Sequence, residues 1–272
     1  MAKISIITIN YNDKKGLEKT IKSVFNQTFR DFEFIVIDGG STDGGKEILE
    51  QNSEKIDYWV SEPDKGIYNA MNKGIKVAKG DFLIFMNSGD IFFNEKVLEQ
   101  MEKELIDDYD IYYGDCYRVK NNSTKKRIFP EKLSFSFFYS GTLSHQSTFI
   151  RRKLFFDIFL YNEDYKIASD WEFFIYAICY KNVPYKYLNL TISNFDFTGL
   201  SSVARYRNLS TEERRQSINK YFPLFAEDYE LVSVLTSKRF LQILHIQKFP
   251  FSWKIVKAVM NIILIFIPKL NK

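Results

Sequence analysis

The feature that most constrains the fold is an alternation of apolar runs with amphipathic segments at the start of the chain. A run rich in β-branched residues predicts a strand at 3–9, and further apolar runs predict strands at 32–37, 56–60 and 81–86. Apolar residues at helical spacing predict helices around 17–25, 46–51 and 67–78. Strands that alternate with helices form a parallel sheet with helices on its faces. This part is therefore predicted to be a doubly wound α/β unit.

The pattern loosens after residue 95. Strands are predicted near 110–113, 148–150 and 185–193, and helices at 96–106 and 170–180. With 45% hydrophobic and 26% charged residues, the composition is that of a globular protein rather than a disordered one. Two cysteines cannot build a disulfide framework, so the chain suits a reducing compartment. We expect these segments to extend the sheet.

Polar clusters follow the four strands predicted in the first part, at 10–13, 38–44, 61–66 and 87–90. Ligands of open parallel sheets bind beyond the carboxyl ends of the strands, so the clusters are expected to converge on one ligand. The first cluster is not the glycine-rich turn of a dinucleotide-binding dehydrogenase. Asp38 suits ribose hydroxyls, although 38–44 also fits a turn with a helix cap. Asp90 suits Mg²⁺ or Mn²⁺ held with a diphosphate, although 87–90 alone fits a simple turn.

Together these motifs resemble family 2 glycosyltransferases. The resemblance is carried by ISIITINYN (4–12), SVFNQTF (23–29), FEFIVIDGGSTDG (32–44), SEPDKGIYNAMNKG (61–74) and FMNSGD (85–90). It returns at HQSTF (145–149) and ASDWEF (168–173) and is absent from the tail. It implies a GT-A fold, a doubly wound and mostly parallel central sheet with helices on both faces, here followed by a helical C-terminal extension.

The resemblance also implies a reaction. A sugar would pass with inversion from a nucleotide-sugar donor, expected to be UDP-linked, to a hydroxyl of a glycan or polyprenyl-diphosphate-linked glycan acceptor. A divalent metal, Mn²⁺ or Mg²⁺, would assist. On the matching positions, donor contacts fall to Ile9, Tyr11, Asp38, Asp64, Lys65, Asn87 and Ser88, metal binding to Asp90 and His145, and the role of catalytic base to Asp170.

Several of these assignments have alternatives. Ser88 stands where many family members have the first Asp of an Asp-x-Asp motif, so Asp90 alone supplies a charge there. Asp170 also fits a helix cap, and Glu172 competes with it for the role of base. A lone histidine such as His145 is often structural. Residues 199–202 with Arg205 are a candidate loop over the donor.

The tail differs in charge from the rest of the chain. Seven basic residues and no acidic residue follow Glu230, whereas the remainder has a net charge of −3. The apolar run within 249–268 is too short to span a bilayer; with Trp253 and flanking lysines it resembles an interfacial helix on an anionic membrane. The alternative is a helix docked on its own core or on a partner subunit. An isoleucine run suits lipid better than a phosphate backbone, so no nucleic acid partner is expected.

We therefore predict a non-processive glycosyltransferase of cell-surface polysaccharide synthesis, because the Gln-x-x-Arg-Trp sequence of processive synthases is absent. It is expected to be cytoplasmic, peripheral on the inner face of the cytoplasmic membrane, and able to form a homodimer. Residues 1–95 are assigned to nucleotide-sugar binding, 96–227 to acceptor binding and catalysis, and 228–272 to the helical extension. The alternative is a non-catalytic nucleotide- or glycan-binding protein on a degenerate transferase fold. A sugar-nucleotide pyrophosphorylase is disfavoured, since no glycine-rich basic loop follows the first strand.

Overall fold

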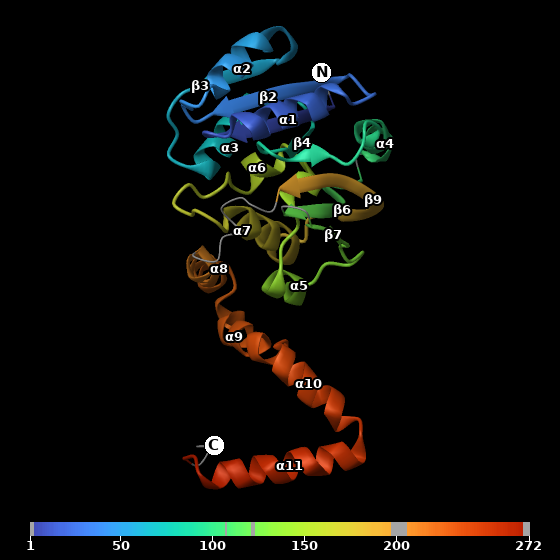
Figure 1. Ribbon diagram of the computed structural model, residues 1–272, viewed down its shortest axis with the longest axis vertical. Helices are drawn as coiled ribbons and strands as arrows, with labels where there is room; N and C mark the ends of the chain where they lie inside the picture. The colour runs from blue at the N-terminus through green and yellow to red at the C-terminus, as the bar shows by residue number, and fades with distance from the viewer. Residues whose placement is uncertain (1–2, 107, 121–122, 197–205, 269–272) are drawn as a thin grey trace. The chain divides into compact units, whose positions relative to one another are not determined.

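The computed structural model describes residues 3–106, 108–120, 123–196 and 206–268 (Figure 1). The chain forms two compact units, residues 1–221 and 222–272. The strands of the first unit are β1 (Ile4–Asn10), β2 (Phe32–Asp38), β3 (Tyr58–Ser61), β4 (Phe82–Phe85), β5 (Ile91–Phe92), β6 (Ile111–Lys120), β7 (Ser123–Arg127), β8 (Thr148–Arg151) and β9 (Tyr185–Asp196). Its helices are α1 (Lys14–Phe25), α2 (Gly45–Gln51), α3 (Ile67–Val77), α4 (Val97–Glu104), α5 (Phe135–Ser140), α6 (Leu154–Asp157), α7 (Ser169–Ile175) and α8 (Arg207–Tyr221).

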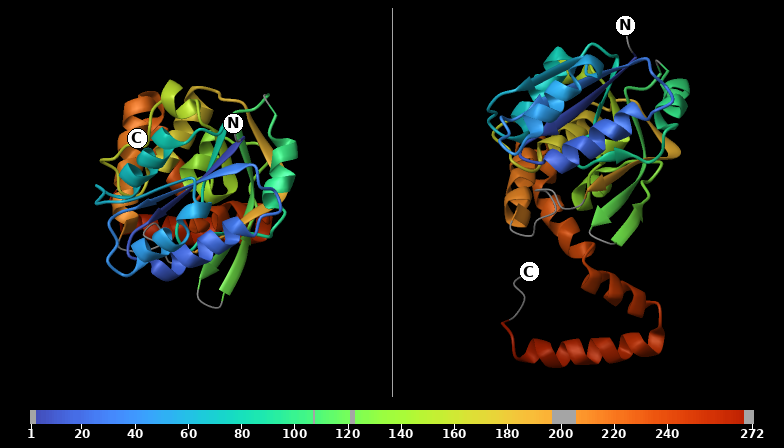
Figure 2. Two further views of the ribbon diagram at one scale, coloured as in Figure 1. Left: turned by 90° about the horizontal axis from the view of Figure 1, so that it is seen from above. Right: turned by 45° about the horizontal axis from the view of Figure 1, so that its top comes forward.

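The nine strands found among the described residues form one sheet in the order β3-β2-β1-β4-β8-β6-β9-β5, with β7 paired to β6. β1 is parallel to β2 and β4, and β2 is parallel to β3, as the alternation of strands and helices predicts. β8 is antiparallel to both β4 and β6 and joins the two parts of the sheet. The predicted α/β class, with helices around the sheet, is confirmed (Figure 2).

Helices pack on both faces of the parallel strands. On one face, Ile6 of β1 belongs to a buried apolar cluster with Leu17 of α1 and Leu98 of α4. Successive residues of a strand point to opposite faces, so Ile7 faces α3. There α3 approaches so closely that a Cβ atom on Gly74 would lie 2.5 Å from Ile7 Cγ2. The strand ends are thereby fixed by packing on either side.

The end of β9 returns to the carboxyl ends of the parallel strands. β5 begins directly after Asp90 and pairs antiparallel with β9, with Ile91 opposite Asn194. β9 also runs parallel to β6, with a register shift after Gly114. As a result, the backbone N–H of Asp196, at the end of β9, donates to Asp90 Oδ1 at 3.0 Å.

The second half of the sheet departs from the sequence expectations in length. The strand predicted at 110–113 continues to Lys120, because β7 and β9 pair with its polar end on both sides. β7 itself, with the sequence STKKR, has no apolar alternation and was not predicted. The helix predicted at 170–180 is α7 followed by a π-helix at Tyr176–Tyr180.

The second unit contains α9 (Ala226–Leu235), α10 (Lys238–Gln247) and α11 (Pro250–Ile265). On α11, Lys254, Lys257 and Asn261 fall at i, i+3 and i+7 and form one polar strip. Apolar side chains that include Ile255 (51% exposed) and Val259 (49% exposed) occupy the wide arc around it. Within the described part of the chain, no helix combines the length and the apolar character needed to cross a membrane.

Candidate active site

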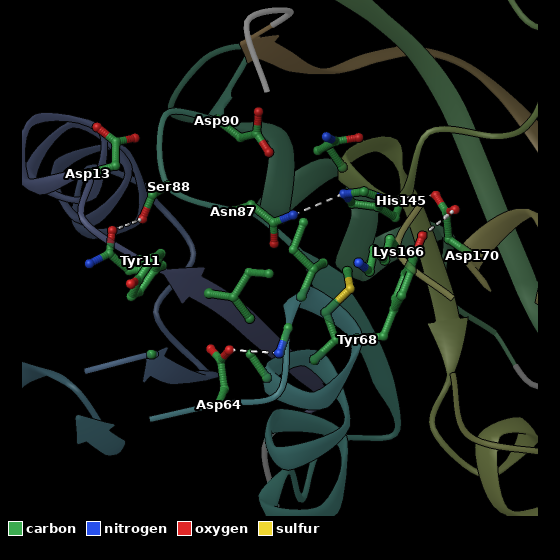
Figure 3. Close-up of a pocket in the computed structure, with 18 of the residues that line it drawn as sticks. Tyr11, Asp13, Asp64, Tyr68, Asn87, Ser88, Asp90, His145, Lys166 and Asp170 are labelled. Carbon is green, nitrogen blue, oxygen red and sulfur yellow. Dashed lines mark hydrogen bonds and ion pairs between the residues drawn. The ribbon is translucent and has the colours of Figure 1, made fainter. Parts of the chain in front are cut away.

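A cavity of about 880 Å³ opens beyond the carboxyl ends of β1, β2, β3 and β4 (Figure 3). All four polar clusters contribute residues to its lining, and the segments before β8 and at the start of α7 complete it. The predicted site residues that line it are Ile9, Tyr11, Asp64, Asn87, Ser88, Asp90, His145 and Asp170. Two other predicted site residues, Asp38 and Lys65, are not among the described residues that line the cavity.

Asp38 is fully buried at the end of β2. Its carboxylate accepts hydrogen bonds from Asn10 Nδ2 at 2.6 Å, from Ser61 Oγ at 2.6 Å and from the backbone N–H of Ser41 at 2.9 Å. Burial alone would raise the pKa of Asp38, but these hydrogen bonds outweigh it and hold the pKa below its usual value. Asp38 therefore ties the ends of β1, β2 and β3 together, and its contact with a nucleoside stays a prediction.

Tyr11 and Asp64 stand at one end of the cavity (Figure 3). Tyr11 is 67% exposed, and Asp64 accepts a hydrogen bond from the backbone N–H of Gly66 at 2.8 Å. A Cβ atom on Gly39 would lie 2.4 Å from Asp64 Oδ2 and 3.2 Å from Tyr11 Cδ2, so any larger residue would force the Asp64 carboxylate to move. An exposed ring beside a carboxylate suits a flat heterocycle that stacks on the ring and donates an N–H to the carboxylate.

Ser88 is linked by hydrogen bonds to the buried ends of β1 and β2. Its hydroxyl donates to Asn10 Oδ1 at 2.8 Å, and Asn10 in turn donates to Asp38. The Ser88 hydroxyl is thus used within the protein. A serine at this position fixes the loop after β4 and adds no charge to the cavity.

Asp90 and Asp196 form a pair of carboxylates in the cavity wall. Burial raises the pKa of Asp90 to about 7; the charge of Asp196 adds to this effect, and the hydrogen bond from the backbone N–H of Asp196 opposes it. Two crowded carboxylates fit Mg²⁺ or Mn²⁺, which commonly bind one or two carboxylates together with phosphate oxygens and water. Among the described residues, no group of three or more His, Cys, Asp or Glu side chains is arranged for a metal. An ion here would therefore depend on a bound diphosphate.

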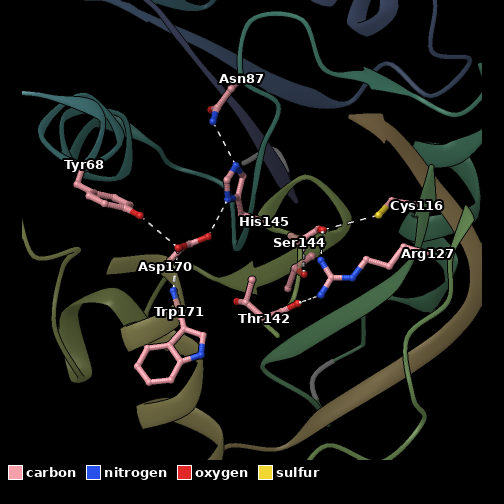
Figure 4. Close-up of polar contacts among 10 residues, drawn as sticks. Tyr68, Asn87, Cys116, Arg127, Thr142, Ser144, His145, Asp170 and Trp171 are labelled. Atoms are coloured by element: carbon pink, nitrogen blue, oxygen red, sulfur yellow. Dashed lines mark hydrogen bonds and ion pairs between the residues drawn. The ribbon is translucent and has the colours of Figure 1, made fainter. Parts of the chain in front are cut away.

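Asp170 lies at the other end of the cavity and is hydrogen-bonded through both oxygens (Figures 3 and 4). Oδ1 accepts from Tyr68 OH at 3.2 Å and from the backbone N–H of Trp171 at 2.8 Å. Oδ2 lies 3.1 Å from His145 Nδ1, and Asn87 Nδ2 lies 3.2 Å from His145 Nε2. Because an amide nitrogen only donates, Nε2 accepts and Nδ1 carries the hydrogen given to Asp170. Both nitrogens of His145 are engaged, so a metal at Nε2 would have to displace Asn87.

Glu172, the competing candidate for the base, does not line the cavity. It is 1% exposed and interacts with Ser217, Lys220 and Tyr221 of α8. Two residues along a helix turn the side chain to a different face from that of Asp170. The geometry therefore favours Asp170 over Glu172.

A buried glutamate on α8 holds the segment that leads into α7. Glu213 is 4% exposed, and its carboxylate accepts hydrogen bonds from the successive backbone N–H groups of residues 166–168, at 2.8, 3.0 and 2.9 Å. Lys166 and Ile167 of this segment line the cavity, and Asp170 follows shortly after it. The position of Asp170 thus depends on a residue far along the sequence.

Asn10 and Asp13 line the cavity as members of the predicted cluster 10–13, although neither was given a role of its own. Sequence reasoning missed four further lining residues, namely Tyr68, Gln146, Lys166 and Asp196. Tyr68 and Gln146 lie inside the motifs that carried the resemblance. Asp196 follows the strand predicted at 185–193, so its place at a strand end was the available signal. The predicted loop at 199–202 and Arg205 lies outside the described residues.

Comparisons with known proteins agree with this geometry. The family model described as Glycosyl transferase family 2 matches residues 5–163. An uncharacterized glycosyltransferase of Mycobacterium tuberculosis is 35% identical over 205 residues, which cover 73% of this chain and 77% of that protein. The Escherichia coli enzyme WfgD, named UDP-Glc:alpha-D-GlcNAc-diphosphoundecaprenol beta-1,3-glucosyltransferase, is 31% identical over 135 residues, which cover 49% of this chain and 53% of that protein.

The fold also resembles solved structures. Residues 1–349 of S. aureus TarS, in complex with UDP-GlcNAc, superpose with a TM-score of 0.63 at 23% identity, over 87% of this chain and 67% of that one. The chain spans 42% of the longer TarS chain. This likeness shows a GT-A-like fold, and the family match and the relatives define the class of protein as a glycosyltransferase. More narrowly, the chain belongs to glycosyl transferase family 2, which confirms the resemblance seen in the sequence.

Proposed function

We propose that this enzyme transfers one sugar, with inversion, from a UDP-sugar to a hydroxyl group of a lipid-linked glycan. The observation that carries the proposal is the presence of Asp170 and the Asp90–Asp196 pair in the wall of one cavity. The name of WfgD, which states a UDP-sugar donor and a diphosphoundecaprenol acceptor, supports this choice of substrates. The UDP-GlcNAc bound to TarS supports a UDP-linked donor.

The donor would lie over the residues of 1–95. Its base would stack on Tyr11 and donate to Asp64, in the gap that Gly39 keeps open. Its diphosphate would reach the Asp90–Asp196 pair through Mg²⁺ or Mn²⁺. When bound, such an ion supplies positive charge that stabilises the departing UDP.

The acceptor would enter over the residues of 96–227, toward Asp170. A carboxylate oxygen of Asp170 removes the proton from the acceptor hydroxyl as its oxygen attacks the anomeric carbon. The bond from that carbon to the phosphate oxygen breaks, and both electrons leave with UDP. Attack on the face opposite UDP inverts the configuration. His145 and Tyr68 hold the carboxylate in place through their hydrogen bonds.

We also propose that α11 lies on the inner face of the cytoplasmic membrane. Its polar strip carries two lysines, and its broad apolar arc matches a helix sunk part-way into an anionic surface. A lipid-linked acceptor would be met at the same surface. The predicted homodimer is not required by this arrangement.

The decisive experiment is a donor and acceptor assay with purified protein. UDP-, GDP- and dTDP-sugars are incubated with a short-chain polyprenyl-diphosphate-linked sugar, in Mn²⁺, Mg²⁺ or EDTA. Asp170→Asn should lower transfer by about 10²–10⁴-fold while UDP binding persists, since general base catalysis contributes about that much. Asp90→Ala should weaken metal-dependent UDP binding as well as transfer.

Asp157→Asn serves as the matched control, because Asp157 is an exposed carboxylate paired with Lys153 at 3.6 Å. It should behave like the unaltered protein. UDP binding without transfer to any acceptor would support the non-catalytic binding protein instead. Full activity of Asp170→Asn would refute the role of Asp170 as the catalytic base.

A further inference from the structure

Three arginine side chains gather beside the segment that carries His145. β7 places Arg127 opposite Cys116 of β6, and Arg118 lies two residues beyond Cys116 on that strand. Residues at this spacing share one face of a sheet, so Arg118 and Arg127 are diagonal neighbours. From α8, the guanidinium carbon of Arg214 lies 5.0 Å from the ring centre of Trp171, the residue after Asp170.

The guanidinium of Arg127 is fixed close to the catalytic carboxylate (Figure 4). It donates to the carbonyl oxygen of Thr142 and to Ser144 Oγ at 3.5 Å, directly before His145. Its carbon lies 4.5 Å from the ring centre of Phe129. These contacts hold one positive charge just behind the histidine that hydrogen-bonds to Asp170.

The charges of the three arginines act on one another. Burial, together with the nearby charges of Arg118 and Arg214, lowers the pKa of Arg127 to about 10, while Asp170 acts in the opposite direction. Arg127 remains protonated at neutral pH. Like charges brought together at a half-buried site destabilise the free protein, and such clusters mark functional sites.

A hydroxyl beside the cluster also lacks a partner among the described residues. Thr142 Oγ1 is buried and makes no hydrogen bond within that part of the chain, although the carbonyl oxygen of the same residue accepts from Arg127. Buried hydroxyls are normally hydrogen-bonded. An anion held by the arginines would accept a hydrogen bond from this hydroxyl.

We propose that Arg118, Arg127 and Arg214 bind the diphosphate that links the acceptor sugar to its lipid carrier. The inference rests on the proposed lipid-linked acceptor and extends it to named residues. Guanidinium groups bind phosphate oxygens with two parallel hydrogen bonds, which suits a diphosphate better than a neutral sugar. Among the described residues the arginines do not line the cavity themselves, but the cluster reaches it at His145, directly after Ser144, so a sugar whose hydroxyl faces Asp170 would direct its own diphosphate toward the arginines. The donor diphosphate, in contrast, belongs at Asp90 and Asp196.

Two probes test this with the full chain, in Mg²⁺ and saturating UDP. One is α-GlcNAc linked to octanol through a diphosphate, and the other is the plain octyl glycoside of α-GlcNAc. Calorimetry should show that the diphosphate probe binds at least about tenfold more tightly, as expected for charge-assisted hydrogen bonds. In Arg118→Gln and Arg214→Gln this preference should fall to about threefold or less, and Arg214→Lys should retain part of it.

Arg215→Gln is the matched control, since Arg215 is exposed on α8 and pairs with Glu212 at 3.1 Å. It should keep the full preference. Equal binding of the two probes by the unaltered protein, or a preference that survives Arg118→Gln and Arg214→Gln, overturns the proposal. A parallel loss of UDP affinity in these variants overturns it too, by assigning the arginines to the donor. If the protein bound no UDP, the proposed function would be refuted. The affinities of the two probes could still be compared, so the two tests are independent.

Discussion

Replacing Glu213 with alanine is expected to weaken both the stability of the first unit and the positioning of Asp170. The Glu213 carboxylate accepts three backbone hydrogen bonds from residues 166–168, just before α7. Alanine leaves all three N–H groups without this partner. Glutamine keeps one acceptor oxygen but turns its amide nitrogen toward at least one backbone N–H group. Both of these groups are donors, so that hydrogen bond is lost.

The magnitude follows from the burial of these groups. The bond to residue 168 is buried, and the bonds to residues 166 and 167 are part-buried, so water replaces some of what is lost. With about 1–3 kcal/mol for each buried group left unsatisfied, we expect a loss of about 3 kcal/mol for alanine and 1–2 kcal/mol for glutamine. For a unit of this size, about 3 kcal/mol lowers Tm by roughly 6–12 °C.

Thermal unfolding and steady-state transfer together check this prediction. Because the segment also positions Asp170, kcat should fall by about tenfold or more, with UDP affinity unchanged. Glu212→Ala is the control: its side chain makes an exposed ion pair with Arg215, which contributes about 0.5 kcal/mol at most. The reasoning would be refuted if Glu213→Ala had the same Tm as Glu212→Ala and the kcat of the unaltered protein.

Three further predictions concern other parts of the chain. Because the pKa of Asp38 is lowered in the folded state, the ionised carboxylate stabilises the fold above about pH 4, and this stabilisation is lost as the pH falls through the folded pKa. In urea unfolding, Asp38→Asn should be less stable than the unaltered protein by about 2 kcal/mol at pH 7, and the difference should shrink in acid. Gly39→Ala should weaken UDP binding by about tenfold in calorimetry at unchanged Tm, since its Cβ atom displaces Asp64. Val259→Asp should lower cosedimentation with anionic vesicles by about tenfold, because it places a charge in the apolar arc of α11.

Each of these predictions has a matched comparison. For Asp38→Asn the comparison is Asp31→Asn, which removes an exposed carboxylate and should leave the urea unfolding curve unchanged both at pH 7 and in acid. Gly39→Ala added to Asp64→Ala should cost little further affinity if the clash with Asp64 is the cause. Asn261→Asp adds the same charge within the polar strip of α11 and should reduce vesicle binding far less than Val259→Asp. Equal effects of the two α11 changes would contradict an orientation in which the apolar arc meets lipid.

The sequence predicted the parallel part of the fold because its determinants are local. Strands such as Phe82–Phe85 are buried on both sides and read as continuous apolar runs. Their carboxyl ends must share one edge of the sheet, so the amino-acid pattern alone places Tyr11, Asp64 and Asp90 around one cavity. Asp170 joined that set only through the resemblance, since nothing near it in the sequence points to the cavity.

Contacts between distant segments were beyond such reasoning. Glu213 lies on a polar helix, where a glutamate usually faces solvent, and its burial depends on a segment some 45 residues away. The hydrogen bonds of His145 depend on Asn87, from another strand end. β7 is polar throughout and is a strand only because β6 pairs with it. In each case the partner, rather than the local pattern, decides the role of the residue.

The antiparallel strand β8 has a consequence for how such a chain can change. It meets β4 through only two residue pairs, Phe82 with Arg151 and Leu83 with Ile150, and meets β6 through three. A related sequence could be exchanged on the far side of this short junction with few pairings to re-establish, namely those of β8 and the two residue pairs between β5 and β9. Residues 1–95, proposed to hold most of the nucleotide-sugar, would be inherited intact, while Asp196 and the proposed acceptor side would come from the exchanged sequence. One scaffold could in this way supply many linkages by recombination across two short strand contacts.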